Sequence, residues 1–339
     1  MPEKLCVIIP AYNEESVIRD CLNGLAAQTY RHFEAFIIDD LSTDNTKSII
    51  QEFVAKDPKR FRFFEFGKVG PGKARNLAAY ETTAEILVFT DADCIPTPKW
   101  LEELVRCYKD PSIGSAGGPH RAPPQSSIFQ LQVESFLLRT SPLTQFIQTH
   151  PEEIVETRHN PLCNVSYRRE IFIRLHGFRE DLFPGEDVEI DLRVKALGHR
   201  ISYNPKALVF HHRPESIQQF RKVMHAYGRS MGKLTRESGP RRLPQWIGVA
   251  SVLVWAFLFW ILVRHFRLEG LLAVSILFAI FYQFRPDVSA TWSLWTNSFQ
   301  WFNGFYEGFI TQRSEPPGFN PLSLSERAAK LRKSKNQEK

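Results

Sequence analysis

Short apolar runs alternate with longer segments of helical spacing from the first residues as far as Pro119. The runs rich in β-branched and aromatic residues are predicted strands: Cys6–Pro10, Ala35–Asp39, Phe61–Phe66, Ile86–Thr90 and Ile113–Gly117. The segments between them are predicted helices: Glu15–Gln28, Thr46–Lys56, Lys73–Thr82 and Pro98–Tyr108. Strands spaced in this way are joined by right-handed helical crossovers, so the pattern predicts an α/β fold with a mostly parallel sheet flanked by helices.

The ends of the predicted strands carry acidic and amide side chains. These ends read Pro10-Ala11-Tyr12-Asn13-Glu14, Asp39-Asp40 and Asp91-Ala92-Asp93. Open α/β sheets bind ligands at the carboxyl ends of their strands. Residues i and i+2 of an extended segment face the same way, so Asp91 and Asp93 are expected to address one cation. Hard carboxylate oxygens favour Mg²⁺ or Mn²⁺, and the alternative is a solvated turn that holds no metal.

A glycine-rich loop, Gly67–Ala74, nearly matches the phosphate-binding P-loop pattern. The hydroxyl residue that binds Mg²⁺ in that pattern is replaced here by Ala74. A P-loop ATPase is therefore an alternative that leaves the segment after the first strand without a role. The preferred interpretation places Lys73, Arg75 and Asn76 near a ligand at a helix N-terminus, and the rival one is that they only cap and solvate that helix.

Two long apolar runs follow in the C-terminal part of the chain. Trp246–Val263 contains eighteen residues without a charge, and Leu271–Phe284 is a second run. At about 1.5 Å per residue the first would span ~27 Å as a helix, close to the ~30 Å of a bilayer core. The runs predict a C-terminal membrane helical hairpin, with a buried hairpin of a soluble domain as the alternative. The aromatic but partly polar stretch Val288–Ile310 is predicted to be an interfacial helix.

The net charge of +6 is concentrated in two places. Residues 213–242 hold eight basic and two acidic residues, and residues 321–339 hold six and two. Basic flanks on a near-neutral body fit a surface of anionic membrane lipid, and they do not fit a nucleic-acid partner. Residues 216–233 have the spacing of an amphipathic helix that lies on such headgroups.

These features divide the chain into a catalytic domain (1–215), a basic amphipathic connector (216–242), a membrane-associated helical region (243–312) and a basic tail (313–339). Five cysteines without C-x-x-C spacing exclude a disulfide scaffold and favour a reducing compartment. The first apolar run, Leu5–Ile9, is too short for a signal peptide. The expected location is the cell membrane, with multiple spans and the catalytic domain in the cytoplasm.

The motifs follow one another along the chain in a defined order. Val7–Glu15, Ile38–Asp44, Gly72–Asn76 and Asp91–Asp93 are followed by Asn164, Arg168-Arg169-Glu170, Gly177-Phe178, Gly185-Glu186-Asp187 and His211-His212. This series resembles the inverting family 2 glycosyltransferases, which have the Rossmann-like GT-A fold. The resemblance covers roughly residues 5–230, and each motif is weak alone although their joint order is specific.

The resemblance implies a nucleotide-diphosphate-sugar donor and assigns residues to it. Pro10, Ala11, Tyr12 and Glu14 would line the nucleoside pocket. Asp40 would accept a hydrogen bond from the base, and Asp39 would support the turn. The resemblance also brings Lys73, Arg75 and Asn76 close to the donor.

The same resemblance implies a metal site and a base. Asp91 and Asp93 would hold a divalent cation, Mn²⁺ or Mg²⁺, on the diphosphate, and His211 is a candidate third ligand or an ordinary core histidine. Asp187 would be the general base, with Glu186 beside it. Two adjacent carboxylates should raise at least one pKa by repulsion, as a base requires. The alternative is that this acidic pair only caps the helix predicted at Val188–Leu197.

One departure bears on the product. Processive members carry a Q-x-x-R-W signature, whereas Gln218–Arg221 is followed by Lys222. Two or three spans are also too few to enclose a polymer channel. The sequence therefore predicts transfer of a single sugar to a lipid-linked or saccharide acceptor at the cytosolic membrane face. The alternative from another class is a non-catalytic membrane scaffold of the same fold.

Overall fold

The computed structural model describes residues 3–144, 152–240, 244–251, 253, 254, 257 and 300–310. These residues divide into two compact units. The first unit contains the described residues between 3 and 126 and between 152 and 213. The second contains residues 127–144 and the described residues from 214 onward.

The first unit is built on an eight-stranded sheet with the order β3-β2-β1-β4-β9-β6-β10-β8. Its strands are β1 (Leu5–Ala11), β2 (Phe33–Asp39), β3 (Phe61–Phe64), β4 (Ile86–Phe89), β6 (Ile113–Gly117), β8 (Val155–Thr157), β9 (Val165–Arg168) and β10 (Arg200–Tyr203). The four neighbouring strands β3, β2, β1 and β4 are parallel to one another, and β6 and β10 are also parallel. The predicted mostly parallel α/β sheet is confirmed, and β9 and β8 are its antiparallel members.

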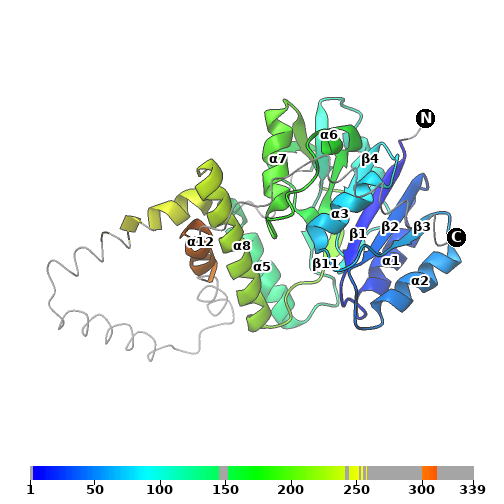
Figure 1. Ribbon diagram of the computed structural model, residues 1–339, viewed down its shortest axis with the longest axis horizontal. Helices are drawn as coiled ribbons and strands as arrows, with labels where there is room; N and C mark the ends of the chain where they lie inside the picture. The colour runs from blue at the N-terminus through cyan, green and yellow to red at the C-terminus, as the bar shows by residue number, and fades with distance from the viewer. Residues whose placement is uncertain are drawn as a thin grey trace. The chain divides into compact units, whose positions relative to one another are not determined.

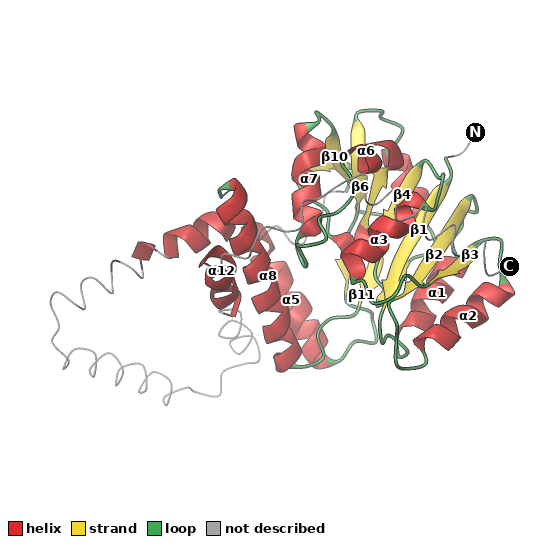
Figure 2. Cartoon of the chain, in the orientation of Figure 1, coloured by secondary structure: helices red, strands yellow, loops and turns green. Residues whose placement is uncertain are grey.

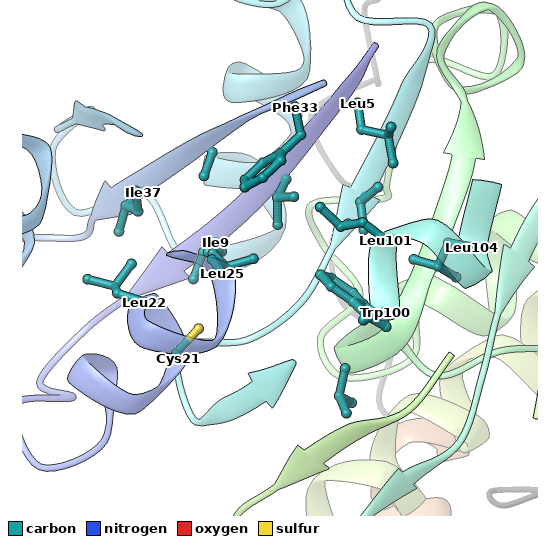
Figure 3. Close-up of a cluster of buried hydrophobic side chains, with 14 of the residues drawn as sticks. Leu5, Ile9, Cys21, Leu22, Leu25, Phe33, Ile37, Trp100, Leu101 and Leu104 are labelled. Atoms are coloured by element: carbon teal, nitrogen blue, oxygen red, sulfur yellow. The ribbon is translucent and has the colours of Figure 1, made fainter. Parts of the chain in front are cut away.

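Helices cover both faces of this sheet (Figure 2). They are α1 (Ile18–Ala26), α2 (Thr46–Lys56), α3 (Pro71–Tyr80), α4 (Trp100–Cys107), α6 (Arg169–Arg174) and α7 (Glu186–Ala196). Successive side chains of β1 point to opposite faces, so Val7 and Ile9 join one apolar cluster while Cys6 and Ile8 join the other. Figure 3 shows the first cluster, in which Leu22 and Leu25 of α1 and Trp100 of α4 lie against the strands.

A second, three-stranded sheet was not predicted. It has the order β5-β11-β7 and consists of β5 (Cys94–Pro96), β7 (His120–Arg121) and β11 (Val209–His211). Its strands are two or three residues long, too short to show a period in the sequence. Asn164 helps to hold this region, because its buried amide donates to the carbonyls of Pro119 and Ala207 and its oxygen accepts from the Trp100 indole.

The second unit is helical. It includes α5 (Ile128–Thr144), α8 (Ile217–Ser238) and α12 (Gln300–Ile310), which are labelled in Figure 1. The Ser216 hydroxyl caps α8 by accepting a hydrogen bond from the Gln219 amide at 3.3 Å. Gly228 and Gly232 of α8 face α12, and Gly304 and Gly308 of α12 face α8. The two backbones therefore touch without intervening side chains.

This unit changes the predicted domain boundaries. Residues 127–144 lie outside the sheet unit, although the sequence analysis placed them in the catalytic domain. The predicted connector and the predicted interfacial helix share a unit, because the glycine faces of α8 and α12 pack on each other. Both patterns are amphipathic helices, and amphipathicity alone does not say whether the buried face meets lipid or another helix.

The predicted membrane hairpin lies largely outside the described residues. Residues 244–251 are helical, whereas the second apolar run, Leu271–Phe284, and the basic tail are not described. Among the helices that the structure does describe, none combines the length and the apolar character needed to cross a bilayer. All five cysteines are buried and free, in agreement with the absence of a disulfide scaffold.

Candidate active site

The carboxyl ends of three neighbouring parallel strands meet at one edge of the sheet. Ala11 at the end of β1 is in register with Asp39 at the end of β2, and Phe89 ends β4 on the other side of β1. The chain then turns through Asp91 and Asp93, where the Cys94 amide donates to the Asp91 carbonyl at 3.1 Å. The D-x-D segment is therefore a turn and not the extended segment that the sequence analysis assumed.

This turn contributes to a cluster of ligand atoms. The side chains of Asp91, Asp93, Cys94 and His211 each offer one such atom, and all of these lie within 4.8 Å of one another. His211 reaches the cluster because β11 pairs with β5 and places it opposite Cys94. Its Nε2 lies 3.4 Å from Asp93 Oδ2. Two carboxylates and an imidazole fit Mn²⁺ or Mg²⁺, so the predicted ligand residues are brought together.

The titratable groups of this cluster shift one another's pKa values. Burial lowers the pKa of His211, but the neighbouring Cys94 and Asp93 outweigh it and raise the value to about 9. Burial raises the pKa of Glu14 to about 7, and the charges of Asp93 and Asp91 add to that effect. The carboxyl groups at this edge repel one another, and a cation placed among them would relieve that repulsion.

A second acidic pair begins α7. Gly185 has a φ of 114° at the N-cap, a left-handed conformation that glycine adopts without strain, and Glu186 and Asp187 form the first turn. Glu186 is 1 % exposed and Asp187 is 9 % exposed. Oδ2 of Asp187 accepts the Leu162 amide at 3.0 Å. The pair is thus held at the helix N-terminus, where the helix dipole favours negative charge.

Arg75 joins the two acidic groups. It lies on α3, is 2 % exposed, and forms a close ion pair with Asp91 through Nη2. Its Nη1 lies 3.5 Å from Glu186 Oε1. Residues far apart in the sequence, from the D-x-D turn and from α7, are therefore connected through one buried guanidinium.

The adjacent carboxylates behave as predicted in one respect. Burial raises the pKa of Glu186 to about 8, the charge of Asp187 raises it further, and Arg75 opposes both effects. Repulsion of the kind expected from the sequence therefore adds to the larger effect of burial at Glu186.

The predicted nucleoside segment lies partly inside the fold. Pro10 and Ala11 are buried at the end of β1, whereas Tyr12 is 41 % exposed. The Lys68 ammonium lies 4.8 Å from the Tyr12 ring centroid, at cation–π distance. Asp39 accepts the Ser42 amide at 3.3 and 3.2 Å, which is the supporting role in the turn that the resemblance implied.

Asp40 has a partner that the sequence analysis did not foresee. Its carboxylate accepts the backbone amides of Val69 at 2.7 Å and Gly70 at 3.1 Å. It therefore holds the glycine-rich loop in place. In a P-loop those amides would face phosphate, so their orientation toward a carboxylate argues against the ATPase alternative.

Asn76 also pairs with backbone. It is fully buried, its amide donates to the Phe178 carbonyl at 2.8 Å, and its oxygen accepts the Phe178 amide at 2.8 Å. Both polar groups of Asn76 pair with backbone, and its binding to the donor stays a prediction. Lys73 remains partly exposed on the first turn of α3.

Two residues near the site were missed by the sequence analysis. Cys94 belongs to the ligand cluster, and the only signal in the sequence was its position next to Asp93. His159 is buried with Nε2 at 3.8 Å from Asp187 Oδ2. It lies in an irregular segment before β9, where no local pattern marks it.

Comparison with known proteins is consistent with this geometry. Residues 6–175, half of the chain, match the profile of Glycosyl transferase family 2. Glycosyltransferase AglE of Haloferax volcanii is 35% identical over 114 residues, which cover 33% of this chain and 38% of that protein. An N-acetylglucosaminyltransferase of Sinorhizobium fredii is 25% identical over 245 residues, covering 68% and 57%. The chain spans less than two thirds of the length of each of these relatives.

Among solved structures, the mannosyltransferase PcManGT from Pyrobaculum calidifontis, in complex with GDP-Man and Mn²⁺, superposes with a TM-score of 0.63. The alignment covers 92% of this chain and 89% of that one, at 19% sequence identity. This likeness shows a shared fold, of the GT-A type.

Proposed function

Because the chain belongs to glycosyl transferase family 2, we propose that it transfers one sugar, with inversion, from a nucleotide-diphosphate-sugar to a lipid-linked or saccharide acceptor. One observation carries the proposal: the Asp91, Asp93 and His211 cluster is joined through Arg75 to the acidic pair of α7. A sugar transferase of this kind needs a site for the diphosphate and a base for the acceptor hydroxyl, and these are the tasks that we assign to the two groups joined by Arg75.

Each group has a distinct task in the reaction. A divalent cation held by Asp91, Asp93 and His211 would neutralise the charge that grows on the departing diphosphate. Asp187 takes the proton from the acceptor hydroxyl. The freed oxygen bonds to the anomeric carbon from the face opposite the diphosphate, and the bond between that carbon and the phosphate oxygen breaks. The diphosphate leaves with the electron pair, so the configuration at the carbon inverts.

Glu186 and Asp187 differ in a way that supports this assignment. The Glu186 side chain is only 1% exposed, and its pKa is raised to about 8, mainly by burial. The Asp187 side chain is 13% exposed and can meet a substrate hydroxyl. We therefore assign the base to Asp187, the more exposed of the two, and a buried place beside Arg75 to Glu186.

The membrane part of the proposal rests on other features. The α8 helix carries Arg221, Lys222 and Arg229 on a basic segment. Large apolar side chains of the following described helix are exposed, with Trp246 at 57 %, Leu253 at 66 % and Phe257 at 58 %. These observations favour a chain attached to the cytosolic face of the membrane through the apolar runs after residue 246. Recovery of the full-length protein from the soluble fraction after lysis would contradict the attachment.

Donor binding is the direct test of function. Thermal shifts would be measured with UDP-glucose, UDP-N-acetylglucosamine and GDP-mannose, each with and without Mn²⁺, since a ligand that binds the folded state raises its stability. We expect one nucleotide class to stabilise the protein only when Mn²⁺ is present. Release of nucleoside diphosphate from that donor would then distinguish an enzyme from a scaffold.

Two variants probe the assigned roles. Asp93→Asn should abolish the stabilisation by donor and Mn²⁺, because it removes a charged ligand. Asp187→Asn should keep that stabilisation and lose turnover by about 10²–10⁴-fold, the usual contribution of a general base. Turnover like that of the wild type in both variants would refute the proposed site.

A further inference from the structure

A buried histidine lies between two carboxylates of α7. The Nδ1 atom of His159 is 2.9 Å from Asp191 Oδ2, and its Nε2 atom is 3.8 Å from Asp187 Oδ2. Asp187 and Asp191 are four residues apart on the same helix and so lie on one face. His159 is 6 % exposed and Asp191 is 1 % exposed. The imidazole therefore bridges the predicted base and a carboxylate that solvent does not reach.

Asp191 is held in place from several directions. Its Oδ1 accepts the Tyr167 hydroxyl at 3.0 Å, and its Oδ2 also accepts the Asn160 amide at 3.2 Å. Burial raises the pKa of Asp191, while the hydrogen bonds from His159 and Tyr167 lower it. A carboxylate with this many donors is a rigid anchor, and it orients the imidazole by accepting a hydrogen bond from Nδ1.

The orientation leaves one nitrogen for Asp187. With Nδ1 engaged by Asp191, Nε2 is the atom that points to the Asp187 carboxylate. The imidazole therefore lies beside the same Asp187 oxygen that accepts the Leu162 amide. The other Asp187 oxygen, Oδ1, accepts the Val188 amide at 2.8 Å. The base is thus bounded by backbone amides and by His159.

We propose that His159, anchored by Asp191, is a positioning residue for Asp187 and keeps that carboxylate in the orientation from which it takes the proton of the acceptor. The proposal rests on the function proposed above, because it assigns His159 a part in the same reaction. His159 does not touch the substrate and takes no proton from it. Its effect is on the placement of the Asp187 carboxylate and on the groups that surround it.

Other charged or titratable side chains also lie near Asp187 and Asp191. Glu186 precedes Asp187 on α7, and Arg75 approaches Glu186 from α3. Tyr167 approaches from β9 and donates to Asp191. Lys195 lies one turn beyond Asp191 on α7, and its pKa is lowered by burial. Replacing His159 leaves Glu186, Arg75, Tyr167 and Lys195 in the chain, so a shift in the pH profile reports on the imidazole and its bond to Asp191.

The test replaces His159 by glutamine in the full-length protein. The probe is the sugar nucleotide selected by thermal shift with Mn²⁺, and the readout is release of nucleoside diphosphate as a function of pH. We expect His159→Gln to lower kcat/KM near neutral pH by about 10–100-fold, a typical effect of losing a partner that orients a reacting group. The acid limb of the kcat/KM profile should move upward by about one pH unit, because the substitution removes a group that can carry positive charge from beside Asp187.

Tyr167→Phe is the matched control. It removes a hydrogen bond to the same Asp191 but leaves the imidazole facing Asp187. It should lower the melting temperature and leave the acid limb where it is in the wild type. Asp191→Asn keeps the shape of the anchor without its charge, so it should shift the acid limb in the same direction as His159→Gln. The Asp191→Asn variant also tests the role of His159 if the His159→Gln variant does not fold.

The outcomes separate this inference from the proposed function. If the wild type releases no nucleoside diphosphate from any donor, the proposed function fails. If the wild type is active but His159→Gln and Asp191→Asn keep its acid limb, or lose activity equally at every pH, the role assigned to His159 is wrong. Donor stabilisation by Mn²⁺ should be the same in all variants, since none of them alters the ligand cluster.

Discussion

The glycine faces of α8 and α12 allow a prediction that can be worked from the coordinates. A Cβ atom added at Gly304 would lie 2.0 Å from the His225 carbonyl oxygen and 2.8 Å from the Arg229 amide nitrogen. One added at Gly228 would lie 1.8 Å from the Trp301 carbonyl oxygen. The obstacles are backbone atoms, so no side-chain rotation can relieve the overlap. Gly304→Ala must push the two helices apart.

The cost follows from two opposing effects. Contacts below 3.0 Å are essentially not found for real Cβ atoms, so the helices must separate by about 1 Å or more. Forcing extra atoms into a packed interface costs roughly 1–3 kcal/mol, and here Trp301 and Phe305 also lose part of their packing. Alanine regains about 1 kcal/mol because it is the better helix former. We expect a net destabilisation of about 1–2 kcal/mol.

Gly72→Ala provides the comparison. Gly72 lies in α3, and a Cβ atom there would meet nothing closer than 3.9 Å. The same gain in helix propensity, about 1 kcal/mol, then acts without a clash. Thermal unfolding and resistance to limited proteolysis of the full-length protein would be measured for both variants. Opposite signs are expected: Gly304→Ala lowers stability and Gly72→Ala does not. Equal or higher stability of Gly304→Ala would show that the helices are not in backbone contact.

Two further predictions concern the sheet unit. Burial raises the pKa of Glu186 from 4.5 to about 8, so the folded protein keeps a proton that the unfolded chain releases, and this group makes stability fall as pH rises from about 5 to 8. Glu186→Gln should remove that loss of stability, so the melting temperature of the variant minus that of the wild type should increase across this pH range. A difference that stays constant with pH would contradict the raised pKa of Glu186. Asn76→Ala leaves the Phe178 amide and carbonyl without partners in a buried site, and should cost about 2–4 kcal/mol in urea unfolding. At low pH Asn76→Asp should be more stable than Asn76→Ala, because a protonated carboxyl group can still form hydrogen bonds with the Phe178 backbone.

Much of the site was accessible from the sequence because the relevant patterns are local. The strand at Ile113–Gly117 and the helix at Thr46–Lys56 have the same bounds in the structure as in the prediction. Parallel strands place their carboxyl ends at a common edge, so Asp39 and Asp91 were expected to lie near each other before any coordinates. The acidic pair of α7 was found by its order among the other motifs.

Other features depend on contacts between distant residues. His211 joins Asp93 only because two very short strands pair, and neither strand is long enough to show a period. Asp40 and Asn76 were assigned to the donor, yet they bond to the backbone of Val69 and Phe178. A polar side chain in a motif can serve a ligand or a turn, and only the position of its partner decides between the two.

The sequence by itself determined the order of strands and helices and the edge at which the acidic residues gather, because hydrophobic periodicity and strand direction act over a few residues. The tertiary structure alone decided that Arg75 connects Asp91 to Glu186. It also decided that the His159 imidazole lies 3.8 Å from the Asp187 carboxylate, and that α8 packs on α12 through glycine residues. These arrangements join residues that are tens of positions apart. Their energy comes from burial and pairing in three dimensions, which no local pattern records.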